Sequence, residues 1–512
     1  MKKTKPTIFV ILDGWGIGTK DDMNAIWLAK TPVFDYLSEK YPTTQLGATG
    51  KDVGLDNRQT SGSETGHMNI GAGRIAIQDS RKISESINTG TFFHNAAFLG
   101  AIAHVKKNKS NLHLMGLLGN EDSPHMNPYH LEALLLLAKK NNIKNVFIHF
   151  FTDGRDSYPK NALNHLASWE KRMKLIGVGK IASLVGRFYA MDRAKNWDRL
   201  KIAYDLLVSG KGKKFSKATD AVKYSYKKNL TDEYIKPSLI DGQGKKFVTI
   251  NNNDSVIFFN LRSDRARQFS KLFVLEKSEE TRLPNPRLKN IYFVAMTNFG
   301  PDLPLHTAFQ DHPINGTLPS ALAKFSQLYI AETEKFAHIT YFLNGGYADA
   351  LNGEDRLMIP SPITDNYAKI PEMSAEKITQ KVLGFLKKGK YDFTALNFAN
   401  ADMIGHTGDM KATIKAVEIV DKCLGKVFKE LQKYKGNLII TADHGNADCM
   451  WDKKARLSMT FHTKNPVPFL LVSDRFKRRK LTSGGVLGNI SPTICDIMGT
   501  DKLKEMKKRS LL

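Results

Sequence analysis

The chain has 512 residues, of which 41% are hydrophobic, so it can bury two or three domain cores and is not disordered by composition. The N-terminal apolar run, 8–12, is too short for a signal peptide and no run reaches transmembrane length, so we expect a cytoplasmic protein without a membrane partner. The net charge of +25 is compatible with an anionic partner, but lysines dispersed as in 211–228 and 502–509 favour a solvated surface that binds no nucleic acid.

Short β-branched and aromatic runs alternate with helical patterns along the chain. Many runs are apolar without alternation, as in strands that are covered on both faces. Strands are predicted at 7–12, 112–118, 145–151, 181–185, 256–260, 291–297, 327–331, 338–343, 393–398, 437–441 and 468–472, and helices at 192–208, 375–387 and 411–434. This alternation predicts an α/β chain with mostly parallel sheets.

The positions of the candidate ligands suggest the domain organisation. Acidic residues and histidines that suit a metal occur at 13–67 and again at 402–462, whereas the middle of the chain holds arginines. We therefore predict a discontinuous metal-binding domain, 1–77 with 312–512, and an inserted α/β domain, 78–311, that binds the substrate. The chain would cross between the domains near Gln78 and near 311–313.

The three cysteines are Cys423, Cys449 and Cys495. Their number is odd and no C-x-x-C spacing is present, so neither a disulfide framework nor a structural zinc site is expected. A reducing cytosol fits this pattern best.

Acidic side chains and histidines gather where predicted strands end, which is where sites form in open α/β sheets. These residues are Asp13, Asp402, His406, Asp443, His444 and His462. Six ligands are enough for two divalent cations, and mixed nitrogen and oxygen ligands suit manganese, zinc or cobalt. Each histidine alone is more often an ordinary core or surface residue, but the placement of the whole set favours a metal site.

Two nucleotide-binding motifs are excluded. The glycine-rich stretch 13–18 (DGWGIG) follows a predicted strand, but its spacing is not G-x-G-x-x-G and its leading carboxylate would repel a pyrophosphate. No G-x-x-x-x-G-K-[ST] sequence is present.

Ser63, in the segment 61–67 (SGSETGH), is the candidate nucleophile. A serine hydroxyl is a weak nucleophile until a base or a metal ion activates it. The surrounding residues do not form the G-x-S-x-G elbow of hydrolases, which favours metal activation over a Ser-His-Asp triad. A helix N-cap is the alternative interpretation of this serine.

Five arginines follow three predicted strands of the central region: Arg155, Arg187, Arg193, Arg262 and Arg265. Arginine binds carboxylate and phosphate groups bidentately, so the set predicts a small ligand with one or both groups. The alternative is a group of surface arginines paired with acidic neighbours.

Six stretches together resemble one family almost from end to end. They are 63–74 (SETGHMNIGAGR), 151–156 (FTDGRD), 186–193 (GRFYAMDR), 331–335 (AETEK), 397–408 (NFANADMIGHTG) and 441–446 (TADHGN). The chain resembles the cofactor-independent phosphoglycerate mutases of the alkaline phosphatase superfamily. The resemblance implies an alkaline-phosphatase-like three-layer domain formed by both chain ends, with a second α/β domain inserted.

The implied activity is that of an isomerase of glycolysis and gluconeogenesis. It would interconvert 3- and 2-phosphoglycerate through a phosphoserine, without 2,3-bisphosphoglycerate, in a monomer whose only partner is this small-molecule substrate. Another metal-dependent phosphatase or phosphomutase of the superfamily is the alternative.

The resemblance also implies roles for individual residues. One of two metal ions, usually manganese (cobalt, zinc or magnesium being possible), would bind Asp402, His406 and His462, and the other Asp13, Ser63, Asp443 and His444. Ser63 would be phosphorylated, Lys335 would hold the phosphoryl group, and Asp156 would move a proton between the substrate hydroxyls. The phosphoglycerate would bind to His125, Arg155, Asp156, Arg187, Arg193, Arg262, Arg265 and Lys335.

This sequence departs from the family pattern in two places. The family commonly has asparagine where this chain has Gly62, and the segment 119–127, which contains His125, is one residue longer.

Overall fold

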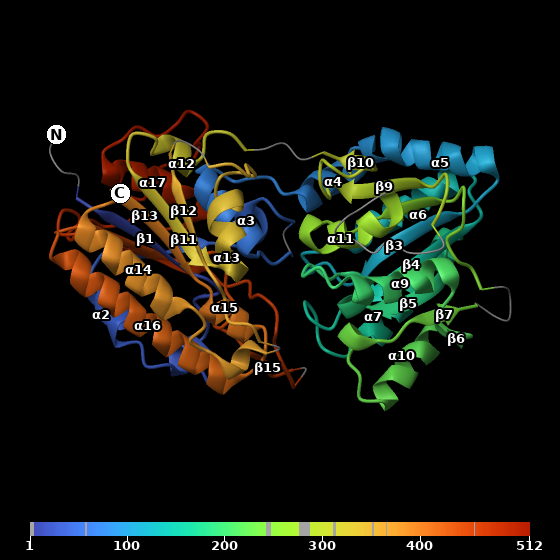
Figure 1. Ribbon diagram of the computed structural model, residues 1–512, viewed down its shortest axis with the longest axis horizontal. Helices are drawn as coiled ribbons and strands as arrows, with labels where there is room; N and C mark the ends of the chain where they lie inside the picture. Colours follow the sequence, from blue (N-terminus) through green and yellow to red (C-terminus); the bar gives the residue numbers. More distant parts are fainter. Residues whose placement is uncertain are drawn as a thin grey trace. The chain divides into compact units, whose positions relative to one another are not determined.

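The computed structural model describes residues 5–56, 59–241, 247–275, 287–310, 314–350, 353–364, 366–454 and 456–512. Two compact units make up the chain (Figure 1). The first unit comprises Met1–Gln78 and Pro313–Leu512, and the second comprises Asp79–His312. The crossing expected at 311–313 falls outside the described residues.

The first unit is built on an eight-stranded sheet with the order β12-β11-β13-β1-β14-β17-β2-β18. The strands are β1 (Thr7–Leu12), β2 (Thr43–Gly47), β11 (Gln327–Glu332), β12 (Asp355–Ile359), β13 (Phe393–Phe398), β14 (Asn437–Thr441), β17 (Val467–Val472) and β18 (Gly485–Val486). Neighbouring strands are parallel except that β17 is antiparallel to both β14 and β2. The strand β1 is buried along its whole length between β13 and β14, as its unbroken apolar sequence predicts.

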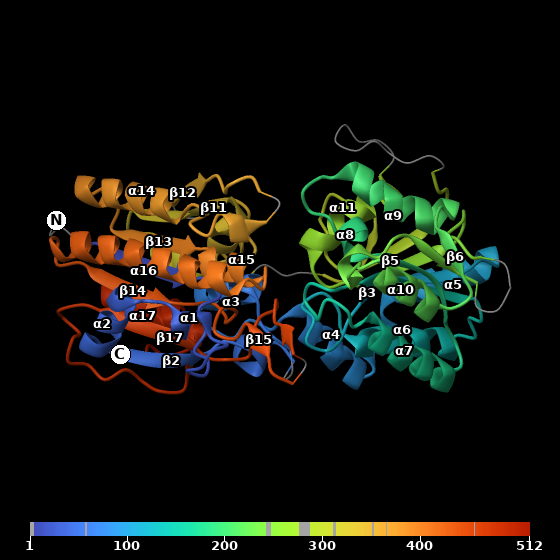
Figure 2. The same ribbon diagram turned by 90° about the horizontal axis from the view of Figure 1, so that it is seen from below.

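Helices cover both faces of this sheet. They are α1 (Ala25–Leu28), α2 (Pro32–Lys40), α3 (Ser63–Ala72), α12 (Leu318–Ala321), α13 (Thr333–Ala337), α14 (Ala375–Lys388), α15 (Asn400–Gly405), α16 (Met410–Gln432) and α17 (Ile490–Met498). Figure 1 shows α2, α14 and α16 on one face and α3, α12 and α17 on the other, and α14 lies beside α16 in Figure 2 as well. The unit therefore has three layers.

The second unit contains another eight-stranded sheet, with the order β10-β9-β8-β3-β4-β5-β7-β6. Its strands are β3 (Leu112–Leu118), β4 (Val146–Thr152), β5 (Lys180–Gly186), β6 (Lys213–Phe215), β7 (Ser238–Ile240), β8 (Ser255–Phe258), β9 (Tyr292–Thr297) and β10 (His306–Phe309). Only the β5–β7 pair is antiparallel. The helices are α4 (Asp79–Asn88), α5 (Ala96–Asn108), α6 (Pro128–Lys140), α7 (Ala162–Ile176), α8 (Arg187–Ala190), α9 (Trp197–Ser209), α10 (Ala218–Lys227) and α11 (Ser263–Val274).

The predicted α/β class with mostly parallel sheets is confirmed, but one predicted strand is wrong. Residues His338–Phe342 form a π-helical turn that continues α13. The rings of His338 and Phe342 stack at 5.5 Å, and a Cβ on Gly71 of α3 would collide with the carbonyl of Leu343. Packing against α3 therefore overrides the β-propensity of this segment. The helix predicted at 192–208 begins later, at Trp197.

Among the described helices, none combines the length and the apolar character needed to cross a membrane. The thiols of Cys423, Cys449 and Cys495 are all free.

A row of buried polar side chains crosses the sheet of the second unit. Asp254 Oδ2 lies 3.1 Å from His113 Nε2, whose Nδ1 lies 3.0 Å from His149 Nε2. His149 Nδ1 in turn lies 2.8 Å from Ser183 Oγ. All four residues are buried, so Ser183 has no access to a substrate and the row satisfies core polar groups instead of forming a catalytic triad.

Because of two buried histidines, we expect the second unit to become less stable in acid. Burial lowers the pKa of His130 to about 3, and burial with the neighbouring His113 holds the pKa of His149 well below its usual value. In the unfolded chain both would titrate near about 6.5. Below that pH the unfolded chain binds protons that the folded chain does not, so stability decreases as the pH falls from 6.5.

We expect the free energy of unfolding of the second unit to fall by about 1.4 kcal/mol per pH unit for each histidine below pH 6.5. Urea unfolding of the whole chain at several pH values between about 7.5 and 5 measures this slope. In the variant His130→Gln, the free energy of unfolding should fall less steeply with decreasing pH, by about 1.4 kcal/mol per pH unit. An unchanged slope in this variant would contradict a neutral His130.

Candidate active site

Three neighbouring parallel strands of the first unit each lead to a carboxylate. Asp13 follows β1, Asp402 lies in the helix α15 directly after β13, and Asp443 follows β14. Because β1 pairs with both β13 and β14, their carboxyl ends meet at one edge of the sheet and bring the three side chains together. All three carboxylates are buried.

The first candidate metal cluster consists of Asp402, His406 and His462, whose ligand atoms lie within 4.8 Å of one another. Both imidazole Nε2 atoms are 3.3 Å from Asp402 Oδ1, and they are 3.1 Å from each other. Nδ1 of His406 lies 2.6 Å from the carbonyl of Thr460, and Nδ1 of His462 lies 2.7 Å from that of Ser61.

These contacts set the tautomers of both histidines. A carbonyl oxygen only accepts, so each Nδ1 carries a proton, and in the neutral form that binds metal each Nε2 then presents a lone pair to the other and to the carboxylate. Three lone pairs that converge without a shared proton fit a cation, and the carbonyls that orient the rings are the outer partners typical of metal-binding histidines.

The second candidate cluster consists of Asp13, Asp443 and His444. His444 Nε2 lies 3.5 Å from both Asp13 Oδ1 and Asp443 Oδ2. Oδ2 of Asp443 is buried, and His67 Nδ1, whose proton points to the carbonyl of Ser63 at 2.9 Å, lies 3.3 Å away, so this oxygen still has a lone pair that fits a cation. Ser63 Oγ joins this cluster, 3.0 Å from His444 Nε2, and it donates a hydrogen bond to Asp13 Oδ1 at 3.1 Å.

Ser63 is the first residue of α3, and Gly62 occupies the N-cap. The interpretation of Ser63 as an N-cap residue is therefore wrong, and its hydroxyl points into the second cluster instead. A Cβ on Gly66 would lie only 2.7 Å from the carbonyl of Asp443, so this glycine lets α3 approach the end of β14. The positive end of the α3 dipole then faces the place where Ser63 would carry negative charge.

Lys335, in the helix α13 after β11, lies between the two clusters. Its Nζ donates to Asp13 Oδ1 at 2.7 Å, to Ser63 Oγ at 2.6 Å and to Asp402 Oδ2 at 2.6 Å. Burial lowers the pKa of Lys335, but Asp13, Asp402 and Asp443 outweigh burial and raise the pKa above its usual value. The ammonium is thus charged and links both clusters to the candidate nucleophile.

Two asparagines and a histidine that the sequence reasoning did not identify support the ligands from outside. Asn397 Nδ2 donates to Asp13 Oδ2 at 2.7 Å and to His67 Nε2 at 3.1 Å. His67 Nδ1 lies 2.9 Å from the carbonyl of Ser63, and Asn446 Nδ2 donates to Asp402 Oδ1 at 3.1 Å. The one available signal was Asn397 itself, an amide inside the otherwise buried apolar strand β13.

In the second unit, Arg187 lies at the centre of a buried group at the ends of β4 and β5. Its Nη1 donates to Asp153 Oδ1 at 2.7 Å and also to Asp156 Oδ2, and its Nη2 lies 3.0 Å from His125 Nε2. His125 Nε2 is also 3.1 Å from Asp156 Oδ2. Burial and the charge of Arg187 lower the pKa of His125 to about 3, so this imidazole is neutral at physiological pH.

Three further arginines share the carboxylate of Asp264. Arg193 Nη1 lies 3.2 Å, Arg262 Nη2 3.1 Å and Arg265 Nε 3.9 Å from Asp264 Oδ2. Burial would raise the pKa of Asp264, but these arginines hold it well below its usual value.

The fifth arginine, Arg155, lies 3.7 Å from Glu233 and has 41% of its side chain exposed. The second unit thus brings the predicted arginines together with His125 and Asp156, and it adds Asp153 and Asp264, whose part in the cluster the sequence reasoning did not identify.

The chain belongs to the metalloenzyme superfamily, whose family model matches residues 5–502. The three-layer first unit and the two ligand clusters agree with this assignment. The 2,3-bisphosphoglycerate-independent phosphoglycerate mutase of Clostridium botulinum (strain ATCC 19397 / Type A) is 45% identical, over 99% of each chain. That of Clostridium acetobutylicum is 46% identical, also over 99% of each chain.

A structural match points to the same family. Crystal structures of Leishmania mexicana phosphoglycerate mutase at low cobalt concentration include a chain that matches with a TM-score of 0.89 and 28% identity, covering 99% of this chain and 97% of that one. The chain belongs to the family of 2,3-bisphosphoglycerate-independent phosphoglycerate mutases, as its sequence predicts. Membership of a metalloenzyme superfamily implies that it binds divalent metal ions.

The central position of Lys335 yields a prediction about stability. Lys335→Met leaves Asp13 and Asp402 buried without their ammonium partner, so we expect the metal-free protein to lose about 3 kcal/mol or more of stability. Manganese should reduce this loss, because the added cation neutralises the same carboxylates. Thermal and urea unfolding with and without metal measure both effects.

Lys390→Met is the matched control, since Lys390 pairs with Asp355 at the surface and should contribute about 1 kcal/mol or less. A metal-independent loss in Lys335→Met would contradict the central position of this ammonium.

The asparagines predict separate effects on the two clusters. Asn397→Ala removes the donor to Asp13, and Asn446→Ala removes the donor to Asp402. Each substitution should lower the affinity of its own cluster for a metal ion about 10- to 100-fold and leave the affinity of the other cluster nearly unchanged, as is typical of residues that support metal ligands. Calorimetric titration of the metal-free variants with manganese resolves the two steps, and each variant is the control for the other. Equal weakening of both steps would contradict the assignment.

Proposed function

We propose that this chain interconverts 3-phosphoglycerate and 2-phosphoglycerate through a phosphoserine at Ser63, without 2,3-bisphosphoglycerate. The observation that carries the proposal is the environment of Ser63 Oγ. It lies within 3.1 Å of Asp13 Oδ1, His444 Nε2 and Lys335 Nζ, at the first residue of a helix. The chain's membership of the mutase family supports the choice of substrate.

Two metal ions would be held by the chain's own ligands. Asp402, His406 and His462 would hold one, and Asp13, Ser63, Asp443 and His444 would hold the other. We propose manganese, with cobalt, zinc or magnesium as alternatives that offer the same charge to mixed nitrogen and oxygen ligands. Such ions activate a bound serine hydroxyl and neutralise charge on transferring phosphoryl oxygens.

The first transfer forms a bond from Ser63 Oγ to phosphorus and breaks the bond between phosphorus and the substrate's O3. The serine proton passes to Asp13 Oδ1, to which the hydroxyl donates a hydrogen bond, and it returns to Ser63 Oγ in the second transfer. The ammonium of Lys335, 2.6 Å from Ser63 Oγ, is placed to donate to a phosphoryl oxygen as negative charge moves across the group. The backbone N–H groups at the start of α3 add favourable electrostatic potential at the same place.

The second transfer reverses this chemistry at the other hydroxyl. Asp156 takes the proton from the O2 hydroxyl and supplies one to O3, so that O2 attacks the phosphoserine and Ser63 Oγ leaves. While the phosphoryl group is on Ser63, the arginines hold the carboxylate of the glycerate that remains. Asp153 orients Arg187, and Asp264 orients Arg193, Arg262 and Arg265.

We place this reaction in glycolysis and gluconeogenesis and in the cytoplasm. Free thiols at all three cysteines support a reducing compartment. That the chain acts as a monomer stays a prediction.

Ser63→Ala tests the proposed nucleophile. Without the hydroxyl no phosphoserine forms, so we expect mutase turnover to fall by at least about a thousandfold, as for other catalytic nucleophiles. The conversion of 3-phosphoglycerate is followed without added bisphosphoglycerate, and phosphoserine is sought by mass spectrometry after a rapid quench.

Ser61→Ala is the matched control, because within the described residues the Ser61 hydroxyl donates one hydrogen bond, to the carbonyl of Gly62, while its backbone carbonyl still orients His462. Near-normal turnover in Ser63→Ala would disprove the nucleophile. Release of inorganic phosphate in place of 2-phosphoglycerate by the unaltered chain would show a phosphatase instead of a mutase.

A further inference from the structure

The first unit contains a cavity of about 710 Å³ for which the proposed reaction has no use. It lies between the outer face of β2 and β17 and the segment 15–38, which includes α1 and most of α2. None of its lining residues belongs to the two metal clusters. Its volume is within the range of small-molecule sites, about 300–1,000 Å³.

Aromatic rings form much of the cavity wall. Trp15 is buried, and its ring centroid lies 5.1 Å from that of Phe34. Trp27 also lines the cavity, but 52% of its surface is exposed. The exposed indole of Trp27 and the partly exposed ring of Phe34 offer an apolar surface that an aromatic ligand would remove from water, and the buried Trp15 supports Phe34 from behind.

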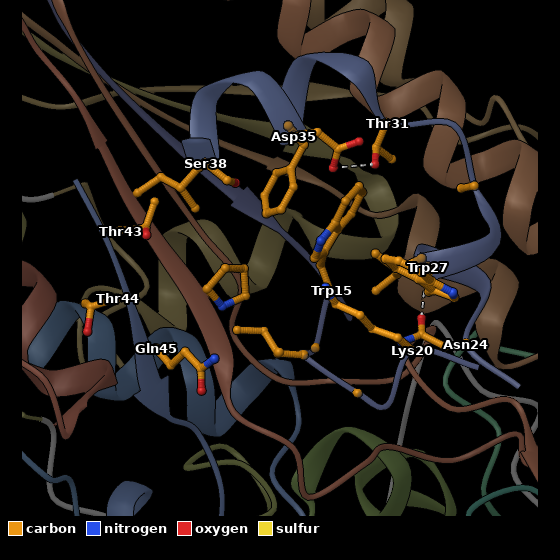
Figure 3. A pocket seen from close by; sticks show the side chains of 18 of the residues that line it. Trp15, Lys20, Asn24, Trp27, Thr31, Asp35, Ser38, Thr43, Thr44 and Gln45 are labelled. Atoms are coloured by element: carbon orange, nitrogen blue, oxygen red, sulfur yellow. Dashed lines mark hydrogen bonds between the residues drawn. The ribbon is translucent and has the colours of Figure 1, made fainter. Parts of the chain in front are cut away.

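The polar groups of the cavity favour an anion. Lys20 Nζ lies 4.8 Å from the centroid of the Trp27 ring, and no carboxylate pairs with it among the described residues. The one carboxylate in the lining, Asp35, keeps its charge, but it lies beside Thr31, away from Lys20 in Figure 3, so an anion beside Lys20 does not contact it. Figure 3 shows Lys20 on the same side as Trp15 and Trp27, with Thr43, Thr44 and Gln45 on the opposite side.

The cavity wall is hydrogen-bonded to the loops that carry the candidate metal ligands. The segment that lines it starts directly after Asp13, and its backbone is tied to the loops that follow His444 and His462. Ala25 N donates to the carbonyl of Ala447 at 3.0 Å, and Ile17 N donates to the carbonyl of Pro466 at 2.8 Å. A ligand in the cavity therefore contacts a segment that is hydrogen-bonded to the loops that carry His444 and His462.

We propose that this cavity is a second binding site, for a planar aromatic molecule that carries one anionic group, and that its occupancy is coupled to metal binding. The ring lies against Trp27 and Phe34, and the anion pairs with Lys20. Because coupling between two sites is reciprocal, the ligand and the metal ion change each other's affinity by the same factor.

The test uses 2-naphthoate and its neutral analogue 2-naphthamide, titrated calorimetrically into the whole chain. We expect 2-naphthoate to bind the unaltered chain, and Lys20→Gln to weaken it about two- to fivefold, as for a partly exposed ion pair, without weakening 2-naphthamide. Ser38→Phe, which fills the cavity from α2, should abolish binding of both. Glu39→Phe adds the same ring at the next residue, which does not line the cavity, and should leave binding unchanged.

Absence of 2-naphthoate binding at millimolar concentration, or undiminished binding to a Ser38→Phe variant that unfolds at the normal temperature, would overturn the site. The coupling is tested by the dissociation constant of 2-naphthoate for metal-free and manganese-loaded protein. Different constants support the coupling, and equal constants would overturn it.

Discussion

The structure of the first unit depends on the placement of three buried carboxylates at the ends of three adjacent strands. Carboxylates this close and this far from solvent repel one another, so the fold is stable only if positive charge is placed among them. Lys335 supplies one such charge. Burial and the neighbouring Asp443 raise the pKa of Asp13, whereas Lys335 and the histidines hold the pKa of Asp402 and Asp443 below the usual value despite burial. One ammonium does not balance three carboxylates, which is why we propose that divalent cations supply the missing positive charge here.

The second unit has the opposite imbalance, an excess of positive charge. It gathers arginines, which cannot be deprotonated, and it keeps them together with the carboxylates of Asp153, Asp156 and Asp264. These aspartates orient the guanidinium groups but neutralise only part of their charge. Glu233 beside Arg155 neutralises a further part, and the positive charge that remains fits the proposed ligand with a carboxylate and a phosphate, which arginine binds bidentately. Each unit thus holds an incomplete charge balance that a different component of the reaction completes.

Much of this arrangement could be predicted from the sequence because the strands are unbroken apolar runs and the ligands directly follow them. β1, β3, β13 and β14 begin and end where their sequences predict. The segment 338–343 could not be predicted, because its β-branched and aromatic residues are also suitable for packing against α3. Asn397 and Asn446 were missed for a different reason, since an amide becomes a support for a ligand only when two distant parts of the chain lie side by side.

The order of the strands explains why the chain ends must fold together. β1 is first in sequence, but its two neighbours come from the last quarter of the chain, so the carboxylates that follow the three strands meet only when β13 and β14 have paired with it. Ser63 reaches the same edge on α3, because Gly66 and Gly71 allow close contact with the loop after β14 and with Leu343. An inserted unit that enters after α3 and leaves before α12 disturbs none of these contacts, since it interrupts the chain where no strand of the central sheet is being formed. The discontinuity in sequence is therefore a consequence of building the metal site from the central strands of one sheet.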